Sequence, residues 1–192
     1  MNRPNIKFGG IGIPPFPNVR IFKLFKMIQI KDSALAAAAE KGMDEFLQVF
    51  IDAYLEAIDG KLTTENMSKL NGLQHTLLAW HFFSTEMREG GFVQLIQNGY
   101  GSYIFANPFA KAIKQFGAVE LGKLIYKAKE IYDPNKAVLE RETTDEEFTA
   151  MYVDFEVFDD LEELYFDMEE QQTAMIAAYV DDHIADFAEI IS

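Results

Sequence analysis

Glycines and helix-capping residues divide the chain from Ser33 onward into a series of amphipathic segments. Between these breaks, apolar residues recur at three- and four-residue intervals, the spacing that lines one face of an α-helix. Gly60 and the pair Gly90-Gly91 each follow such a segment, as expected where a helix ends. The pattern predicts an all-α fold for residues 32–192, a single compact domain of about seven to eight helices with acidic C-terminal helices.

Two short sequences mark helix N-termini within this region. Asn71 is followed three residues later by Gln74, and Thr144 is followed three residues later by Glu147. This is the spacing of a capping box, in which each side chain accepts a hydrogen bond from the other residue's backbone N–H. We expect one helix to begin just after Asn71 and another just after Thr144.

A proline is expected to interrupt the second half of the chain. The helix that begins at Ala118 should stop at Asp133-Pro134, because proline lacks a backbone donor and clashes with the preceding turn. Residues 133–143 then read as a polar linker. The last stretch, from Asp159 to about Ile190, is predicted to form one long helix or two.

The N-terminal segment has a different character. Three glycines and three prolines fall within residues 9–17, which is too much punctuation for a regular helix or strand. Residues 1–31 contain six basic side chains and no acidic one. We expect an irregular basic arm over residues 1–31, with a short strand near Met27–Ile30.

Composition excludes several classes of site and compartment. The chain has no cysteine, so disulfides, cysteine-based zinc sites and a cysteine nucleophile are ruled out. Residues 1–18 lack the continuous apolar stretch of a signal peptide. The longest apolar cluster, residues 77–83, is interrupted by His81 and is far shorter than a membrane span. We therefore expect a cytoplasmic protein that does not bind membranes.

The net charge of −14 is concentrated in the C-terminal part of the chain. Residues 136–192 hold 18 acidic and two basic side chains, whereas the preceding 135 residues are close to neutral. A field of this sign repels nucleic acid and attracts basic partners. We expect the protein to bind a basic protein and not to bind nucleic acid directly.

The most acidic run lies between Asp154 and Glu170, with nine carboxylates and no basic residue. On a helical wheel, Leu161, Leu164 and Tyr165 gather on one side, and the carboxylates cover most of the other. Like charges at i,i+4 destabilise a helix, and most surfaces relieve them with interspersed lysines. The predicted partner-binding face comprises Asp154, Glu156, Asp159, Asp160, Glu162, Glu163, Phe166, Asp167, Glu169 and Glu170.

Phe166 falls among these carboxylates on the wheel, where solvation alone gives no reason for an aromatic ring. An apolar side chain at such a position is typical of an interface anchor. Rows of carboxylates about 5–6 Å apart resemble the spacing of phosphates along a DNA strand, so the face would suit the phosphate-binding groove of a basic protein. The alternative interpretation is an ordinary amphipathic helix with a solvated outer face.

Residue types that carry catalysis or bind metals do not form a convincing site. Glu86 and Glu89 have the spacing of an acid–base pair but fit a solvated last helical turn better. His75 and His81 are six residues apart, off a common helical face, and there is no E-x-x-H sequence. The glycines of residues 9–12 lack the flanking strand and helix of a phosphate loop. We expect no catalytic residue, no metal and no cofactor.

Three stretches of the chain resemble a bacterial family. They are Glu86–Gln94, then Asn98–Gly101 with the helix that ends at residues 116–118, then Phe158–Leu161 with Tyr165, Tyr179 and Phe187. Together, over roughly residues 44–187, they are similar to the bacterial DNA-mimic protein family, an all-helical domain whose function was long unknown. The resemblance implies an all-helical fold and, by analogy with its DNA-mimic member, an acidic dimer that binds a transcription factor in place of DNA.

Two functions remain open from the sequence. One is a non-enzymatic DNA mimic that blocks a basic DNA-binding protein, either a transcription factor or a histone-like protein. The other is an immunity-type or adaptor protein that neutralises another basic partner, such as a toxin. In either case the abundance of aromatic residues, 14% of the chain, leads us to expect a homodimer.

Overall fold

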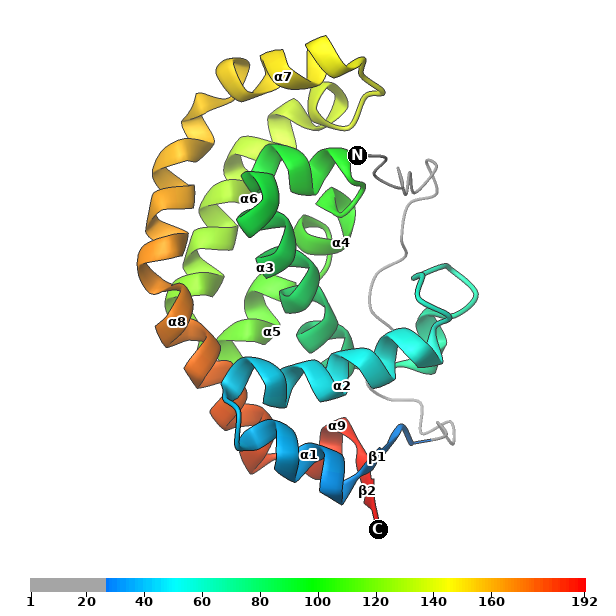
Figure 1. Cartoon of the computed structure of the whole chain (residues 1–192). Coiled ribbons are helices and arrows are strands. Elements are labelled where there is room, and N and C mark those ends of the chain that lie inside the picture. Colours follow the sequence, from blue (N-terminus) through cyan, green and yellow to red (C-terminus); the bar gives the residue numbers. More distant parts are fainter. Residues whose placement is uncertain (1–26) are drawn as a thin grey trace.

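The computed structural model describes residues 27–192, and most of these are helical (Figure 1). The α-helices are α1 Asp32–Ala39, α2 Met43–Ala57, α3 Gly72–Gln97, α4 Gly101–Phe105, α5 Phe109–Gln115, α6 Val119–Leu139, α7 Asp145–Asp154, α8 Asp159–Asp182 and α9 Ile184–Phe187. Two 3₁₀ turns, η1 Met67–Lys69 and η2 Glu156–Phe158, and two strands, β1 Gln29–Lys31 and β2 Glu189–Ile191, complete the described part. The all-α prediction is confirmed. Most of the predicted basic arm, residues 1–26, lies outside the described residues.

Both predicted capping boxes are present. The Asn71 side chain accepts from the backbone N–H groups of Leu73 and Gln74, each at 2.9 Å, and Gln74 Oε1 accepts from the Asn71 N–H at 2.8 Å. Thr144 and Glu147 make the same reciprocal pair at the start of α7. Local sequence therefore fixes where α3 and α7 begin.

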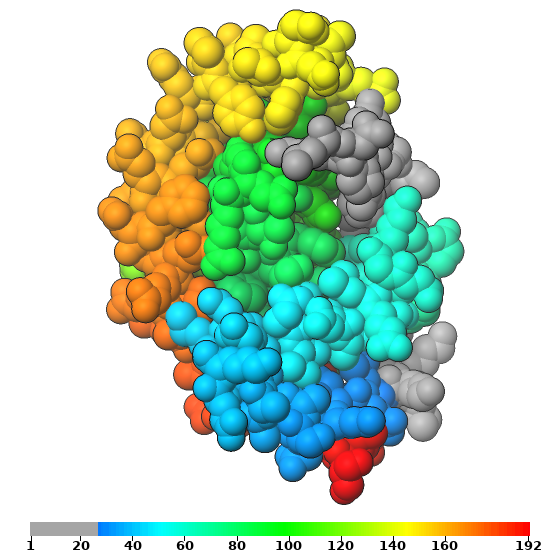
Figure 2. Space-filling view, in the orientation of Figure 1, coloured from blue at the N-terminus to red at the C-terminus, as the bar shows by residue number. Residues whose placement is uncertain are grey.

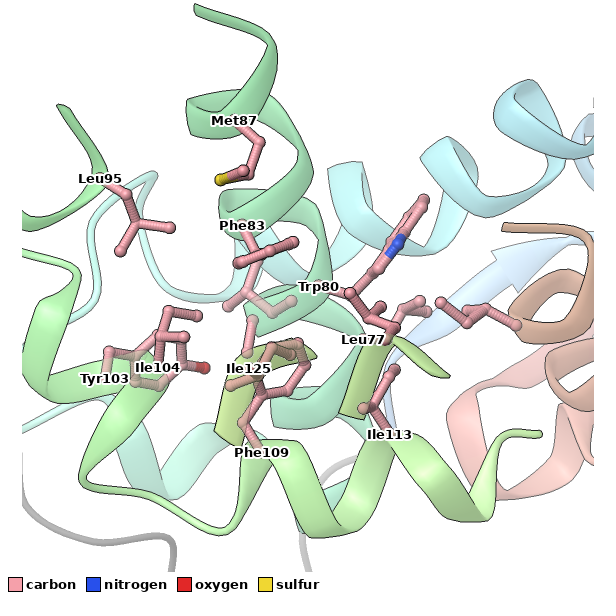
Figure 3. Packing of buried hydrophobic residues seen from close by; sticks show 14 of the residues in the cluster. Leu77, Trp80, Phe83, Met87, Leu95, Tyr103, Ile104, Phe109, Ile113 and Ile125 are labelled. Carbon is pink, nitrogen blue, oxygen red and sulfur yellow. The ribbon is translucent and has the colours of Figure 1, made fainter. Parts of the chain in front are cut away.

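Helix α3 lies at the centre of the molecule, with α2, α4, α5, α6 and α8 packed around it (Figure 1). Figure 3 shows Leu77 and Phe83 of α3 pointing toward Phe109 and Ile113 of α5 and toward Ile125 of α6. All five side chains are fully buried or nearly so. Truncating a buried phenylalanine of this kind to alanine costs about 3–5 kcal/mol of stability, so this contact region is a main source of folding free energy.

Buried apolar residues form one continuous cluster from Ile30 to Ala188. Aromatic rings fill much of it: Phe83 packs edge-on against Tyr165, with centroids 5.2 Å apart, and Phe92 stacks on Phe158 at 5.0 Å. These contacts join α8 and η2 to α3. The assignment of residues 32–192 to a single domain is a proposal that this shared core supports.

The pair Gly90-Gly91 breaks α3 without ending it. Gly91 has φ +70° and ψ −159°, a conformation that only glycine adopts readily. The helix resumes at Phe92 and continues to Gln97. The predicted helix end at Gly90-Gly91 agrees with this break in the backbone geometry.

The expected helix end at Pro134 is wrong, because α6 continues to Leu139. Proline removes one backbone donor and disturbs the turn before it. The carbonyl that loses its donor is that of Glu130, four residues before the proline, and in the same turn the Asn135 side chain donates to the Ile131 carbonyl at 2.9 Å. Leu139 is completely buried, so its packing stabilises the turn beyond the proline, and part of the predicted linker is helical.

The short strand expected near Met27–Ile30 is found as β1, and its partner is β2 at the other end of the described chain. The two strands are parallel, with Gln29 opposite Glu189 and Lys31 opposite Ile191. The neighbouring α9 is held by Gln74, whose Nε2 donates to the Phe187 carbonyl at 2.8 Å. The first and last described elements therefore lie side by side (Figure 1).

Candidate protein-binding face

The acidic run extends over the end of α7, through η2 and along the first half of α8. In the space-filling view these elements form the yellow-to-orange rim of the molecule (Figure 2). Seven of the nine carboxylates in the run belong to exposed residues: Asp154, Glu156, Asp159, Asp160, Glu163, Asp167 and Glu170. Among the described residues, none of these seven has a Lys, Arg or His partner within ion-pair distance.

The geometry of α8 places several of these groups in a row. Asp159, Glu163, Asp167 and Glu170 follow one another at intervals of four, four and three residues. With a rise of about 1.5 Å per residue, the row is roughly 16 Å long. Asp159 and Asp160 also lie in the first turn of the helix, where negative charge is favoured by the helix dipole. The row is therefore compatible with a stable helix despite its crowding.

Glu162 does not belong to the exposed face, contrary to the prediction. Its carboxylate points toward α3 and accepts a hydrogen bond from the backbone N–H of Phe92, with Oε1 2.8 Å from the nitrogen. Burial raises the pKa of Glu162; the Phe92 N–H partly offsets this, and the nearby charge of Asp159 adds to it. The helical wheel placed Glu162 on the outer side because a wheel contains no information about neighbouring helices, here the broken helix α3.

Glu169 also lies inward. Its Oε1 accepts from Arg88 Nε at 2.6 Å and from the Tyr165 hydroxyl at 3.0 Å. The side chain of Glu169 is only 20% exposed. The run from Asp154 to Glu170 contains no basic residue. The cation that pairs with Glu169 is Arg88 of α3, which is 81 residues away in sequence.

Two apolar side chains border the exposed row. Phe166 is 49% exposed and Leu164 is 43% exposed. Since successive residues on a helix turn by about 100°, these two lie on opposite sides of the row. The prediction that Leu164 faces the core is wrong, and Phe166 lies at the border of the row instead of its middle.

Two exposed valines extend the apolar surface toward α7. Val153 is 73% exposed and lies next to Asp154, and Val157 is 54% exposed and lies next to Glu156. Neither valine belongs to the predicted partner-binding face.

Glu86 and Glu89 belong to an amide network, and the expected solvated helical turn is wrong for Glu86, which is buried, while Glu89 is exposed. Glu86 accepts hydrogen bonds from Asn98 Nδ2 at 2.8 Å and from Gln94 Nε2 at 3.3 Å. Gln94 Nε2 also donates to Glu89 Oε2, 3.1 Å away. Burial raises the pKa of Glu86, and these amide hydrogen bonds oppose the rise. The network ties the two halves of α3 together across the Gly90-Gly91 break.

Two open grooves are present on the described part of the surface. An open groove of about 670 Å³ is lined by Met27, Ile184 and Ile190, and a shallow one of about 280 Å³ lies between α1 and α2; neither includes Glu86 or Glu89. Within residues 27–192, no three His, Asp or Glu side chains are arranged to hold a metal ion. In the same range, no helix has the length and apolar character needed to cross a membrane.

Both ring nitrogens of the buried His75 have hydrogen-bond partners in the core. Its Nδ1 lies 3.0 Å from the Tyr103 hydroxyl and its Nε2 lies 2.8 Å from the Met67 carbonyl. Burial lowers the pKa of His75, and the bond to Met67 partly opposes that change. The ring therefore joins η1, α3 and α4 within the core.

Comparison with known proteins identifies relatives over the region that contains this face. A DMP19-like protein family matches residues 68–183, from η1 to the end of α8. The DNA mimic protein DMP19 of Neisseria meningitidis serogroup B (strain ATCC BAA-335 / MC58) is 31% identical over 145 residues, which cover 75% of this chain and 87% of that protein. The resemblance inferred from the glycine turn and the C-terminal helices is confirmed, and the chain belongs to the DMP19-like protein family.

Proposed function

We propose that this protein is a DNA mimic: its acidic face binds a DNA-binding protein and keeps that protein from DNA. One observation carries the proposal, the row of exposed carboxylates on α8 that have no cationic partner among the described residues. Unpaired like charges at helical spacing cost stability, and a basic partner would remove that cost. The name of the Neisseria relative supports the same role.

The borders of the row add a requirement on the partner. Phe166, Leu164 and Val157 are partly exposed apolar side chains next to the carboxylates. An interface gains most of its affinity from such apolar anchors, while charges set the encounter rate and the orientation. The partner we propose is a basic transcription factor or histone-like protein whose DNA-contacting surface also offers apolar side chains.

Further properties follow from this role as proposals. The protein would act without catalysis and without direct contact to nucleic acid, in the cytoplasm. It would do so as a homodimer in which the acidic face points outward, because burying unpaired carboxylates in a subunit interface is costly.

The test uses two matched baits. The wild-type protein and the variant Glu163→Lys/Asp167→Lys are immobilised, and proteins captured from the native cell are identified. A captured DNA-binding protein is then purified and titrated with this protein in the presence of its duplex DNA. We expect capture by the wild type alone, competition between the DNA and this protein for one surface, and weaker binding as salt increases.

Two outcomes would contradict the proposal. Equal capture by both baits would show that the row on α8 is only solvated. A partner that binds its DNA and this protein at the same time would favour the adaptor function over mimicry.

A further inference from the structure

The break in α3 creates a second helix start beside the acidic helix. A helix N-terminus leaves backbone N–H groups without partners inside the helix. At the restart after Gly91, the N–H of Phe92 is bonded instead to the Glu162 carboxylate, 2.8 Å away. Phe92 itself is completely buried, so its N–H depends on a protein acceptor.

Gly91 leaves space for this carboxylate. A Cβ atom at position 91 would lie 2.1 Å from Glu162 Oε1, well inside contact distance. The φ of +70° at Gly91 also disfavours any other residue. The glycine is thus required twice, once for the backbone turn and once for the approach of Glu162.

Neighbouring contacts fasten α7 and α8 to the same short segment of α3. The Tyr152 hydroxyl on α7 donates to the Gly90 carbonyl at 3.1 Å. Arg88 forms its ion pair with Glu169, about two helical turns beyond Glu162. Residues 88–92 therefore contact both helices that carry the acidic face.

We propose that this segment of α3 is a socket, and that Glu162 is a positioning residue that sets which side of α8 faces the partner. The inference rests on the proposed function. Leu161 and Tyr165 anchor α8 by packing, and the edge-on contact of Tyr165 with Phe83 sets the buried side of the helix. The bond from Glu162 to Phe92 adds a directional contact at the edge of that side, so it limits rotation of α8 about its axis and holds Glu163 and Asp167 outward.

The first test compares neighbouring carboxylates with opposite assigned roles. Glu162→Gln keeps an acceptor for the Phe92 N–H and loses the charge, whereas Glu162→Ala loses both. If Glu162 positions the helix, Glu162→Gln should bind the partner as the wild type does. Glu162→Ala should bind more weakly, by up to roughly tenfold, because the lost hydrogen bond lowers the population of the binding-competent orientation by no more than its own free energy. Glu163→Gln, the matched control on the exposed row, should weaken binding and reduce its salt dependence.

Hydrogen exchange at the Phe92 amide reports on the socket without a partner. We expect faster exchange in Glu162→Ala and near wild-type exchange in both Glu162→Gln and Glu163→Gln. If Glu162→Gln instead behaves like Glu163→Gln in binding, Glu162 is a contacting charge and the inference is wrong. Wild-type binding by Glu162→Ala would also overturn it. If the wild type binds no DNA-binding protein, the proposed function is wrong. Independently of that result, unchanged hydrogen exchange at the Phe92 amide in Glu162→Ala would refute the socket.

A double-mutant cycle covers the case in which one variant folds poorly. Gly91→Ala should lower the melting temperature strongly, and adding Glu162→Ala should restore part of the loss because the clash disappears. Gly60→Ala is the matched glycine control, since Gly60 has φ +69° and a Cβ added there would meet no heavy atom within 4 Å. It should be milder, and Glu162→Ala should not rescue it. Strictly additive effects at positions 91 and 162 would contradict the socket.

Discussion

Reversing one charge in the middle of the acidic row should make the folded protein more stable. Glu163 has Asp159 four residues before it, Asp160 three residues before it and Asp167 four residues after it. All four side chains are on α8, and all are exposed. Glu163→Lys therefore replaces three like-charge neighbours with three opposite-charge pairs.

The size of the effect follows from those three pairs. Each repulsive pair at this spacing costs about 0.2–0.5 kcal/mol, and each attractive pair gains a similar amount. Exposure to solvent weakens such terms, so we expect a net gain of about 1 kcal/mol at low salt. For a protein of this size, that corresponds to a rise of roughly 2–4 °C in the melting temperature.

Thermal unfolding followed by far-UV circular dichroism measures this change, at low salt and again near 1 M salt. The high-salt difference should be much smaller, since the screening length falls to about 3 Å. Glu130→Lys is the control, because Glu130 is exposed on α6 with Lys127 and Asp133 at three residues on either side. Its reversal should change the melting temperature little. A lower melting temperature for Glu163→Lys, or one that is unchanged at low salt, would refute the reasoning.

Three further predictions concern binding, acid sensitivity and assembly. Phe166→Ala should leave the melting temperature nearly unchanged, because the ring is half exposed, and should speed dissociation of the partner without slowing association, as surface plasmon resonance would show. His75 should titrate below the ordinary histidine value of 6.5 in an NMR pH series, because burial lowers its pKa. An unfolded chain then binds that proton more readily, so urea unfolding should show stability falling as pH drops below about 6.5. Sedimentation at tens of micromolar should give a dimer, and a lone species of 21.9 kDa would contradict it.

Local signals predicted the parts of the fold that depend on local interactions. The capping boxes at Asn71 and Thr144 satisfy helix N-termini with residues three positions away, so a short sequence contains both partners. The Gly90-Gly91 break was predictable for a similar reason. Pro134 misled because the burial of Leu139 stabilises the turn beyond the proline, and burial depends on tertiary packing.

The acidic face was predicted in outline, and its errors have one cause. A helical wheel assumes that the buried side is opposite the charged side, and it does not register which helix lies alongside. Glu162 and Glu169 turn inward because α3 offers them a backbone N–H and Arg88. Leu164 turns outward because it lies across the helix from those contacts. Long-range partners of this kind are not encoded by spacing within α8.

The parallel pairing of β1 with β2 has a consequence for the order of events during synthesis. Gln29 and its partner Glu189 are 160 residues apart, so β1 emerges from the ribosome long before the strand it needs. Helices α1 to α6 contact one another and can assemble while translation continues, whereas closing so long a loop is slow and requires residues that are synthesised much later. β1 should thus stay sensitive to proteolysis until β2 has been made, whereas α1, which packs on the adjacent α2, should be protected earlier.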